Sequence, residues 1–372
     1  MPTTAGSFAL LGSRPKKNAV VIDRLLDAGV IILGKANMTE FCNYNKTYPG
    51  WNSIGGQTQS AYVVGGVVKG EYKLADISEK SPGGSSTGVA VGTSASFSPI
   101  VVGTETDGSL NPPASRAALF ALKVTVGAAS REGIISISST FDSLGGMGKI
   151  ARDVAVLTDV LLDPGPRAKF PNGLSDFLVD GWQGIRVGFV DASLWQLPPK
   201  LLVSDDEYKK QMVFIFSSRH VGCAKIELGA TVIAPVELPP PGRGSSLKLD
   251  DEAAMPITMR HEFRVLLDAY LTECVGESQV SSLEELMKWN KDHASLELPQ
   301  AGQDLLVGSQ EDTAPIEKVE RARAAVGQIA KNGIDRALAQ SGIEAIIAPT
   351  ESPISSSASS AGYPIATVRL GR

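Results

Sequence analysis

The chain has 372 residues, enough to bury a sizeable core as one large domain or as two or three smaller ones. Its 35 basic and 40 acidic residues give a formal net charge of −5, which argues against the positive surface that nucleic acids and anionic membranes attract. Hydrophobic residues make up 43% and charged residues 20% of the chain, a balance that excludes a disordered protein.

Helical and strand patterns alternate along the chain. The spacing of apolar residues predicts helices at 18–28, 150–162, 206–224, 259–271 and 281–290, and a long helix that Pro315 opens and Gly342 ends. Short apolar or β-branched runs predict strands at 30–32, 185–190, 231–236 and 345–348. This order is typical of an α/β architecture, in which helices cover both faces of a mixed central sheet.

Two segments with unusual composition read as loops. The Pro/Gly stretch 239–246 and the Ser-rich stretch 354–360 are both too short to be linkers between independent domains. We therefore expect one domain over residues 1–372, with the helical stretch 247–306 as an insertion or cap within it.

Several site types are disfavoured. The three cysteines, Cys42, Cys223 and Cys274, lie far apart without a Cys-x-x-Cys pair, which argues against a disulfide framework and a structural zinc. The longest apolar runs are of strand length, well below the ~20 residues of a membrane span, and the N-terminus lacks the charge order of a signal peptide. We expect a cytoplasmic protein without a metal or cofactor, and without a nucleic-acid or membrane partner.

The densest glycine and serine segments point to chemistry. They are SPGGSSTG at 81–88 and GTETDGS at 103–109, and they place Ser85 and Ser109 24 residues apart. Glycines allow unusual backbone geometry, so successive N–H groups before Ser109 could converge on an oxyanion. The alternative for either segment alone is an ordinary Gly/Ser turn. No Ser-His-Asp triad can be assembled by motif, because His220, His261 and His293 look isolated.

Together with ALKVTVGAASREGIISIS and FDSLGGMGKIARDV, these segments resemble the signature stretch of the amidase signature family, serine hydrolases of carboxamides. The similarity extends from TTAGSFALLGS near the start to AGYPIATVRLG near the end, and is greatest to fungal and bacterial amidases of the GTETDGS subgroup. The resemblance implies the amidase-signature fold and cleavage of a small-molecule amide through a serine acyl-enzyme.

The resemblance also implies residue roles. Ser109 matches the nucleophile. Ser85 matches a second serine, which relays the proton of the nucleophile and takes part in a cis peptide bond, at 84–85 or 85–86. The backbone of Thr106, Asp107 and Gly108 matches the oxyanion hole, and Ser86 a supporting serine. Ser109 should lie buried at a loop-to-helix junction beside a pocket, with the N–H groups of residues 106–109 converging on one point.

The base in this family is a lysine in a Lys-Asp-Asn-type motif upstream of the TTAGS element, which here begins at Thr3. Lys35 and Lys123 match other positions of the family, which look structural. We therefore expect a chain clipped at both ends, which by itself hydrolyses amides negligibly. A catalytically silent relative that binds a ligand or partner is the alternative, and a protein that supplies ammonia for aminoacyl-tRNA correction is disfavoured. The oligomeric state is open.

Overall fold

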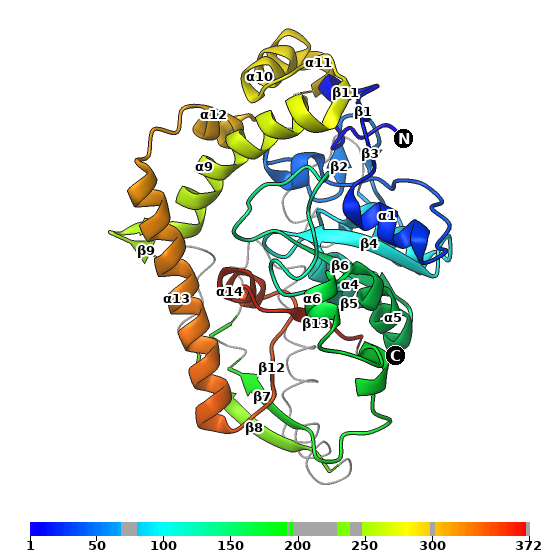
Figure 1. The fold of residues 1–372 in the computed structure, drawn as a ribbon, viewed down its shortest axis with the longest axis vertical. Coiled ribbons are helices and arrows are strands. Elements are labelled where there is room, and N and C mark those ends of the chain that lie inside the picture. Colours follow the sequence, from blue (N-terminus) through cyan, green and yellow to red (C-terminus); the bar gives the residue numbers. More distant parts are fainter. Residues whose placement is uncertain (68–79, 192–193, 196–228, 239–247, 298–301, 370–372) are drawn as a thin grey trace.

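The computed structural model describes residues 1–67, 80–191, 194–195, 229–238, 248–297 and 302–369. Within them, helices pack around two main sheets, and the long helix α13 (Ile316–Ser341) runs along one side of the molecule (Figure 1). The expected α/β class is confirmed. In the described parts, seven strands divide between a four-stranded antiparallel and a three-stranded parallel sheet, and the other strands form two-stranded antiparallel pairs.

The antiparallel sheet carries the two motifs of interest. Its strands lie in the order β13-β5-β6-β4, with bounds Ile365–Thr367, Phe120–Lys123, Ser143–Gly148 and Ile100–Glu105. Successive side chains of β6 point to opposite faces. Leu144 packs with α5 (Ala151–Leu161), whereas Met147 packs with α3 (Thr87–Ser94) and α4 (Asn111–Arg116). Helices therefore cover both faces of this sheet.

Glycines in β6 allow that close packing. A Cβ on Gly146 would lie 2.7 Å from Leu157 Cδ2 of α5, and a Cβ on Gly145 would lie 2.4 Å from Leu122 O of β5. A Cβ at Gly145 would meet backbone that is held in the β5–β6 ladder, and a Cβ at Gly146 would displace the buried Leu157 side chain. The SLGGMG sequence is thus a requirement of the layer spacing.

The parallel sheet lies at the other end of the molecule (Figure 1). Its order is β12-β7-β8, with bounds Ala345–Ile347, Arg186–Val190 and Thr231–Val236. The last turns of α13 cover it, since Ala337 packs with Val236 and Ile343. Gly342 ends α13 in the left-handed conformation at φ 57°, which lets the chain turn directly into β12.

A third layer is mostly helical. The helices α9 (Ala254–Ala269), α10 (Leu283–Asp292) and α12 (Asp304–Gln310) share a core with Leu10 and Phe41 from the N-terminal segment, and α11 (Ala294–Glu297) packs against α10. Short elements complete the described fold: η1 (Phe8–Leu10), β1 (Arg14–Pro15), α1 (Val20–Asp27), η2 (Glu40–Asn43), β2 (Trp51–Asn52), β3 (Gly56–Gln57), α6 (Pro164–Arg167), η3 (Leu174–Phe177), β9 (Lys248–Leu249), β10 (Glu252–Ala253), η5 (Tyr270–Cys274), β11 (Val275–Glu277) and α14 (Ile354–Ala361).

Most predicted elements are confirmed, with bounds shifted by a few residues. The strand predicted at 30–32 is wrong, because residues 30–39 belong to no helix or strand. Val30 and Ile32 pack in the same cluster as Ile100 and Val102 of β4, while Ile31 and Leu33 are 82% and 73% exposed. The segment thus shows the alternation of a strand, but no described strand lies in register to bond with it.

The loop predicted at 354–360 is also wrong, because these residues form α14. The helix packs against α13 and buries four of its five serines, and this tertiary burial overrides the weak helix propensity of serine. The predicted helix 206–224 and loop 239–246 lie outside the described residues.

Candidate active site

The two Gly/Ser segments meet through the backbone. Ser86 N donates a hydrogen bond to Ser109 O at 2.9 Å, and the Gly84–Ser85 peptide is cis, as expected. The Ser86 hydroxyl donates to Thr104 O at 3.0 Å and accepts from Thr104 N at 3.1 Å. A Cβ on Gly103 would lie 2.8 Å from that hydroxyl, so glycine is needed at this position. Ser86 therefore joins the two segments through its backbone N–H and its hydroxyl.

Ser109 lies in the turn between β4 and α4. Glu105 shapes this turn, because its Oε2 accepts three hydrogen bonds of 2.9 Å, from Leu110 N, Asn111 N and Asn111 Nδ2. Residues 106–110 belong to no helix or strand, so their N–H groups are not committed to a regular ladder. The predicted loop-to-helix junction is confirmed, but Ser109 is half-buried rather than buried.

Ser85 is 2% exposed and lies beside the Cys42 thiol of η2. Burial raises the pKa of the Cys42 thiol to about 11, even though the hydroxyls of Ser85 and Thr104 act to lower it. The thiol is therefore neutral near pH 7 and cannot accept a proton from Ser85. Sequence patterns did not indicate Cys42, because its proximity to Ser85 arises only in the folded chain.

The two lysines considered as bases have other partners. Lys123 of β5 is fully buried and donates from Nζ to Tyr363 O at 3.0 Å, and burial lowers its pKa. Lys35 donates to Thr3 Oγ1, and desolvation lowers its pKa. Among the described residues, no hydrogen bond joins either lysine to Ser85 or Ser109.

Asp142 contacts the Ser109 turn and was missed by sequence reasoning. Its Oδ1 accepts from Thr106 Oγ1 at 2.6 Å. Burial raises the pKa of Asp142 to about 6, against the hydrogen bonds that lower it. The antiparallel register pairs Glu105 of β4 with Ser143 of β6, and so brings Thr106 opposite Asp142. Knowledge of this strand pairing would have indicated the contact.

Other buried carboxylates occur in the helical layer. Glu40 and Glu297 are both fully buried, and the Ser53 hydroxyl lies 2.5 Å from Glu40 Oε2 and 2.9 Å from Glu297 Oε2. Burial, together with the neighbouring Glu297 carboxylate, raises the pKa of Glu40. Asn45 Nδ2 donates to Glu40 Oε1, while Asn45 Oδ1 is buried and has no hydrogen-bond partner among the described residues. The arrangement favours a protonated Glu40.

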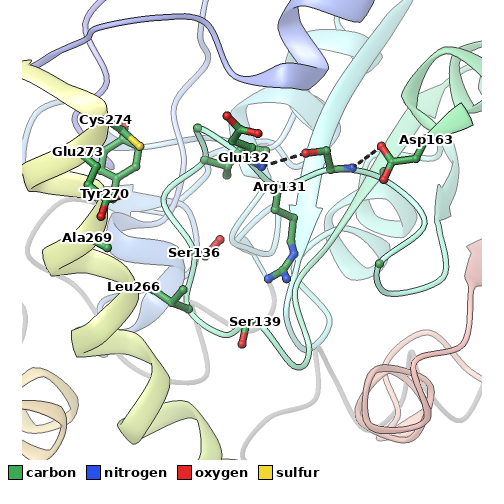
Figure 2. Close-up of a pocket in the computed structure, with 15 residues that line it drawn as sticks. Arg131, Glu132, Ser136, Ser139, Asp163, Leu266, Ala269, Tyr270, Glu273 and Cys274 are labelled. Carbon is green, nitrogen blue, oxygen red and sulfur yellow. Dashed lines mark hydrogen bonds between the residues drawn. The ribbon is translucent and has the colours of Figure 1, made fainter.

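A pocket of about 420 Å³ opens between the loop 127–139 and one end of α9 (Figure 2). Arg131, Glu132, Tyr270 and Glu273 are among its lining residues. A smaller neighbouring pocket is lined by residues that include Cys42, Thr104, Thr106 and Asp142. Ser109 lines neither pocket, so the expected pocket beside the nucleophile is not among these two.

One of the two described histidines, His261, differs from expectation. His261 has an acidic partner, since its Nδ1 lies 3.0 Å from Asp312 Oδ2, whereas His293 stacks on Trp289. His220 lies outside the described residues. In the described ranges, no group of three or more His, Cys, Asp or Glu could hold a metal ion. No helix there is long and apolar enough to cross a bilayer.

Comparisons with known proteins identify the family of the chain. A family model described as Amidase matches residues 1–212. A protein of Arabidopsis thaliana named as a probable amidase is 28% identical, in a match over 99% of this chain and 67% of that protein. A component of the glutamyl-tRNA(Gln) amidotransferase of Deinococcus deserti is 34% identical, over 52% of this chain and 37% of its own.

Solved structures show the same fold. The native peptide amidase of Stenotrophomonas maltophilia superposes with a TM-score of 0.81 at 32% identity, over 100% of this chain and 73% of its own. An amidase family protein of Bacillus anthracis superposes with a TM-score of 0.77 at 25% identity, over 98% of this chain and 66% of its own.

Proposed function

The chain belongs to the amidase family of amide-hydrolysing enzymes, and from this membership we propose that it cleaves a small carboxamide through an acyl-enzyme on Ser109. The observation that carries the proposal is the hydrogen bond from Ser86 N to Ser109 O. It joins the serine of the GTETDGS turn to the SPGGSSTG segment, which holds the second serine of the proposed relay.

In the proposed reaction, Ser109 Oγ attacks the amide carbonyl carbon, and its proton passes to Ser85 and on to a base. The negative charge that develops on the carbonyl oxygen is stabilised by the N–H groups of residues 106–109. The leaving nitrogen takes up a proton as the C–N bond breaks, and water then hydrolyses the ester on Ser109. In the family that the motifs resemble, the base is a lysine.

A serine-directed fluorophosphonate and a panel of small amides test the proposal. Whatever labelling and turnover the chain shows should vanish in Ser109→Ala and fall strongly in Ser85→Ala, by a factor on the order of 10⁴. Ser115→Ala is the matched control, because Ser115 is an exposed serine of the adjacent α4. Labelling that persists in Ser109→Ala would contradict the proposed nucleophile.

The base is tested in the same assays. Lys35→Met and Lys123→Met each remove one lysine of this chain, and neither should alter the labelling rate if the lysines are structural. Selective loss of turnover in one of them, with its thermal stability retained, would assign that lysine as the base. A correctly folded chain that neither turns over amides nor takes the label would favour the silent relative.

A further inference from the structure

Two side chains from distant parts of the chain bind the turn that precedes Ser109. Asp142, the residue before β6, accepts from Thr106 Oγ1 at 2.6 Å. Ser356 of α14 donates from Oγ to Asp107 Oδ1 at 2.7 Å. Asp142 is 8% and Ser356 2% exposed, whereas Thr106 is half-buried and Asp107 is exposed, so each hydrogen bond is shielded from solvent on one side. The turn is thus held from the sheet on one side and from a C-terminal helix on the other.

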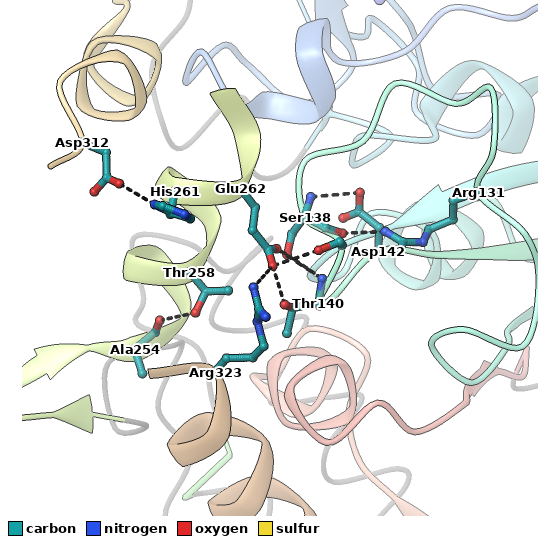
Figure 3. A network of polar contacts seen from close by, with 11 residues as sticks. Arg131, Ser138, Thr140, Asp142, Ala254, Thr258, His261, Glu262, Asp312 and Arg323 are labelled. Carbon is teal, nitrogen blue, oxygen red and sulfur yellow. Dashed lines mark hydrogen bonds and ion pairs between the residues drawn. The ribbon is translucent and has the colours of Figure 1, made fainter. Parts of the chain in front are cut away.

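Asp142 is itself held firmly. Its Oδ2 accepts from Ile137 N at 2.8 Å and from Ser138 N at 3.1 Å, while Asp142 N donates to Ser138 O at 3.1 Å. The Oδ2 atom therefore accepts hydrogen bonds from the backbone of the loop that leads to Asp142, and Oδ1 accepts the hydrogen bond from Thr106. The Arg131 guanidinium, which lies beside Asp142, favours the charged carboxylate (Figure 3). Charge-assisted bonds of this kind orient their partners more strongly than neutral ones.

The contact with α14 extends beyond one hydrogen bond. Gly108 has a φ of 83°, and a Cβ at this position would lie 3.6 Å from both Cβ and Oγ of Ser355. The helix thus presents Ser355 to Gly108 and Ser356 to Asp107. This contact gives a reason for the buried serines of a segment whose composition suggested a loop.

We propose that Asp142 and Ser356 are positioning residues, which hold the turn 106–109 in the shape that stabilises the reacting carbonyl oxygen. This inference rests on the proposed function, because the turn has an oxyanion to stabilise only if Ser109 attacks an amide carbonyl. Oxyanion donors act only when they are already oriented before the charge develops, so a turn of four residues needs such external supports. Neither residue touches the substrate in this role.

Hydrogen–deuterium exchange of peptides that cover residues 103–110 tests the two supports directly. Thr106→Val removes one hydroxyl and keeps the side-chain shape, and Ser356→Ala removes the other. Each should raise exchange in this segment by up to about tenfold, as expected for the loss of one partly buried hydrogen bond. Ser357→Ala is the matched control, because Ser357 lies in the same helix but is half-buried, and it is the neighbouring Ser356 that bonds to Asp107.

Rescue separates positioning from general destabilisation. Asp142→Ala should loosen the turn, whereas Asp142→Asn can turn its carbonyl oxygen to the two backbone N–H groups and its amide to Thr106 Oγ1, and should restore protection. In the fluorophosphonate assay, Thr106→Val and Ser356→Ala should lower the maximal labelling rate about tenfold with little change in thermal midpoint.

The outcomes separate this inference from the proposed function. Exchange in 103–110 that stays at the wild-type level in both Thr106→Val and Ser356→Ala would overturn the inference, as would an equal rise in Ser357→Ala. Failure of the wild-type chain to take the label would count against the proposed function alone, because the exchange measurement needs no activity.

Discussion

Glu262 of α9 collects five hydrogen bonds on one carboxylate (Figure 3). Its Oε1 accepts from Ser139 Oγ at 2.9 Å, Thr140 Oγ1 at 2.7 Å and Arg323 Nη2 at 2.6 Å. Its Oε2 accepts from Ser138 Oγ and from Thr140 N at 3.2 Å. Glu262 itself is 5% exposed. Its hydrogen bonds connect α9 to Arg323 of α13 and to residues 138–140 in the loop before Asp142.

Glu262→Gln keeps the size of this side chain but replaces one acceptor by an NH₂ group. If the NH₂ lies on the Oε2 side, it faces the Thr140 N–H, and if it lies on the Oε1 side, it faces the Arg323 guanidinium. Hydroxyls can rotate to accept, but these two donors cannot. We expect a loss of about 2–4 kcal/mol in the free energy of unfolding, the scale of a buried charge-assisted network that loses one partner.

Urea unfolding at pH 7 measures this loss, and Glu284→Gln is the control, because Glu284 is exposed on α10. Burial alone would raise the pKa of Glu262, but the hydrogen bonds from Ser138, Thr140 and Ser139 outweigh it and lower the pKa below 4.5. The stabilisation is thus present above pH 4.5 and is lost as the pH falls through the lowered pKa. A loss no larger than that of Glu284→Gln, or one that acidification leaves unchanged, would refute this account.

Three further predictions concern packing, charge and the exposed segment. Gly88→Ala should lower the free energy of unfolding in urea by about 1–3 kcal/mol, because the new Cβ would lie 2.3 Å from a backbone carbonyl oxygen. Gly92→Ala in the same helix should raise that free energy by up to about 1 kcal/mol, because its Cβ would meet only a ring atom at 3.9 Å. Glu40→Gln should stabilise the chain relative to wild type, and increasingly so as the pH rises above 4.5, because the raised pKa of Glu40 makes its ionisation in the folded chain costly. A difference in unfolding free energy between variant and wild type that does not vary with pH would contradict this. Changing Ile31 and Leu33 together to serine should shift the unfolding free energy by less than about 0.5 kcal/mol and raise solubility, and a large destabilisation would mean that their exposed faces are covered.

The sequence by itself determined the features that depend on neighbours along the chain. The helix α13 follows from its apolar period, with Pro315 before its first residue and Gly342 at its end, and these signals act within one or two turns. The SPGGSSTG and GTETDGS segments likewise carry their own backbone requirements in their glycines. The family, the fold class and the candidate serines could therefore be inferred before any contact was known.

Only the tertiary structure decided the features that depend on distant partners. Residues 30–33 have the composition of a strand, but a strand also needs a neighbouring strand to bond with. The sequence does not indicate which segments pair. The Ser-rich composition around Ser356 predicts a loop, because serine is a poor helix former. Burial against α13 and the hydrogen bond to the Asp107 carboxylate nevertheless stabilise a helix there. The contact of Asp142 with Thr106 arises from the pairing of β4 with β6, and a hydrogen bond across 36 residues has no local signal.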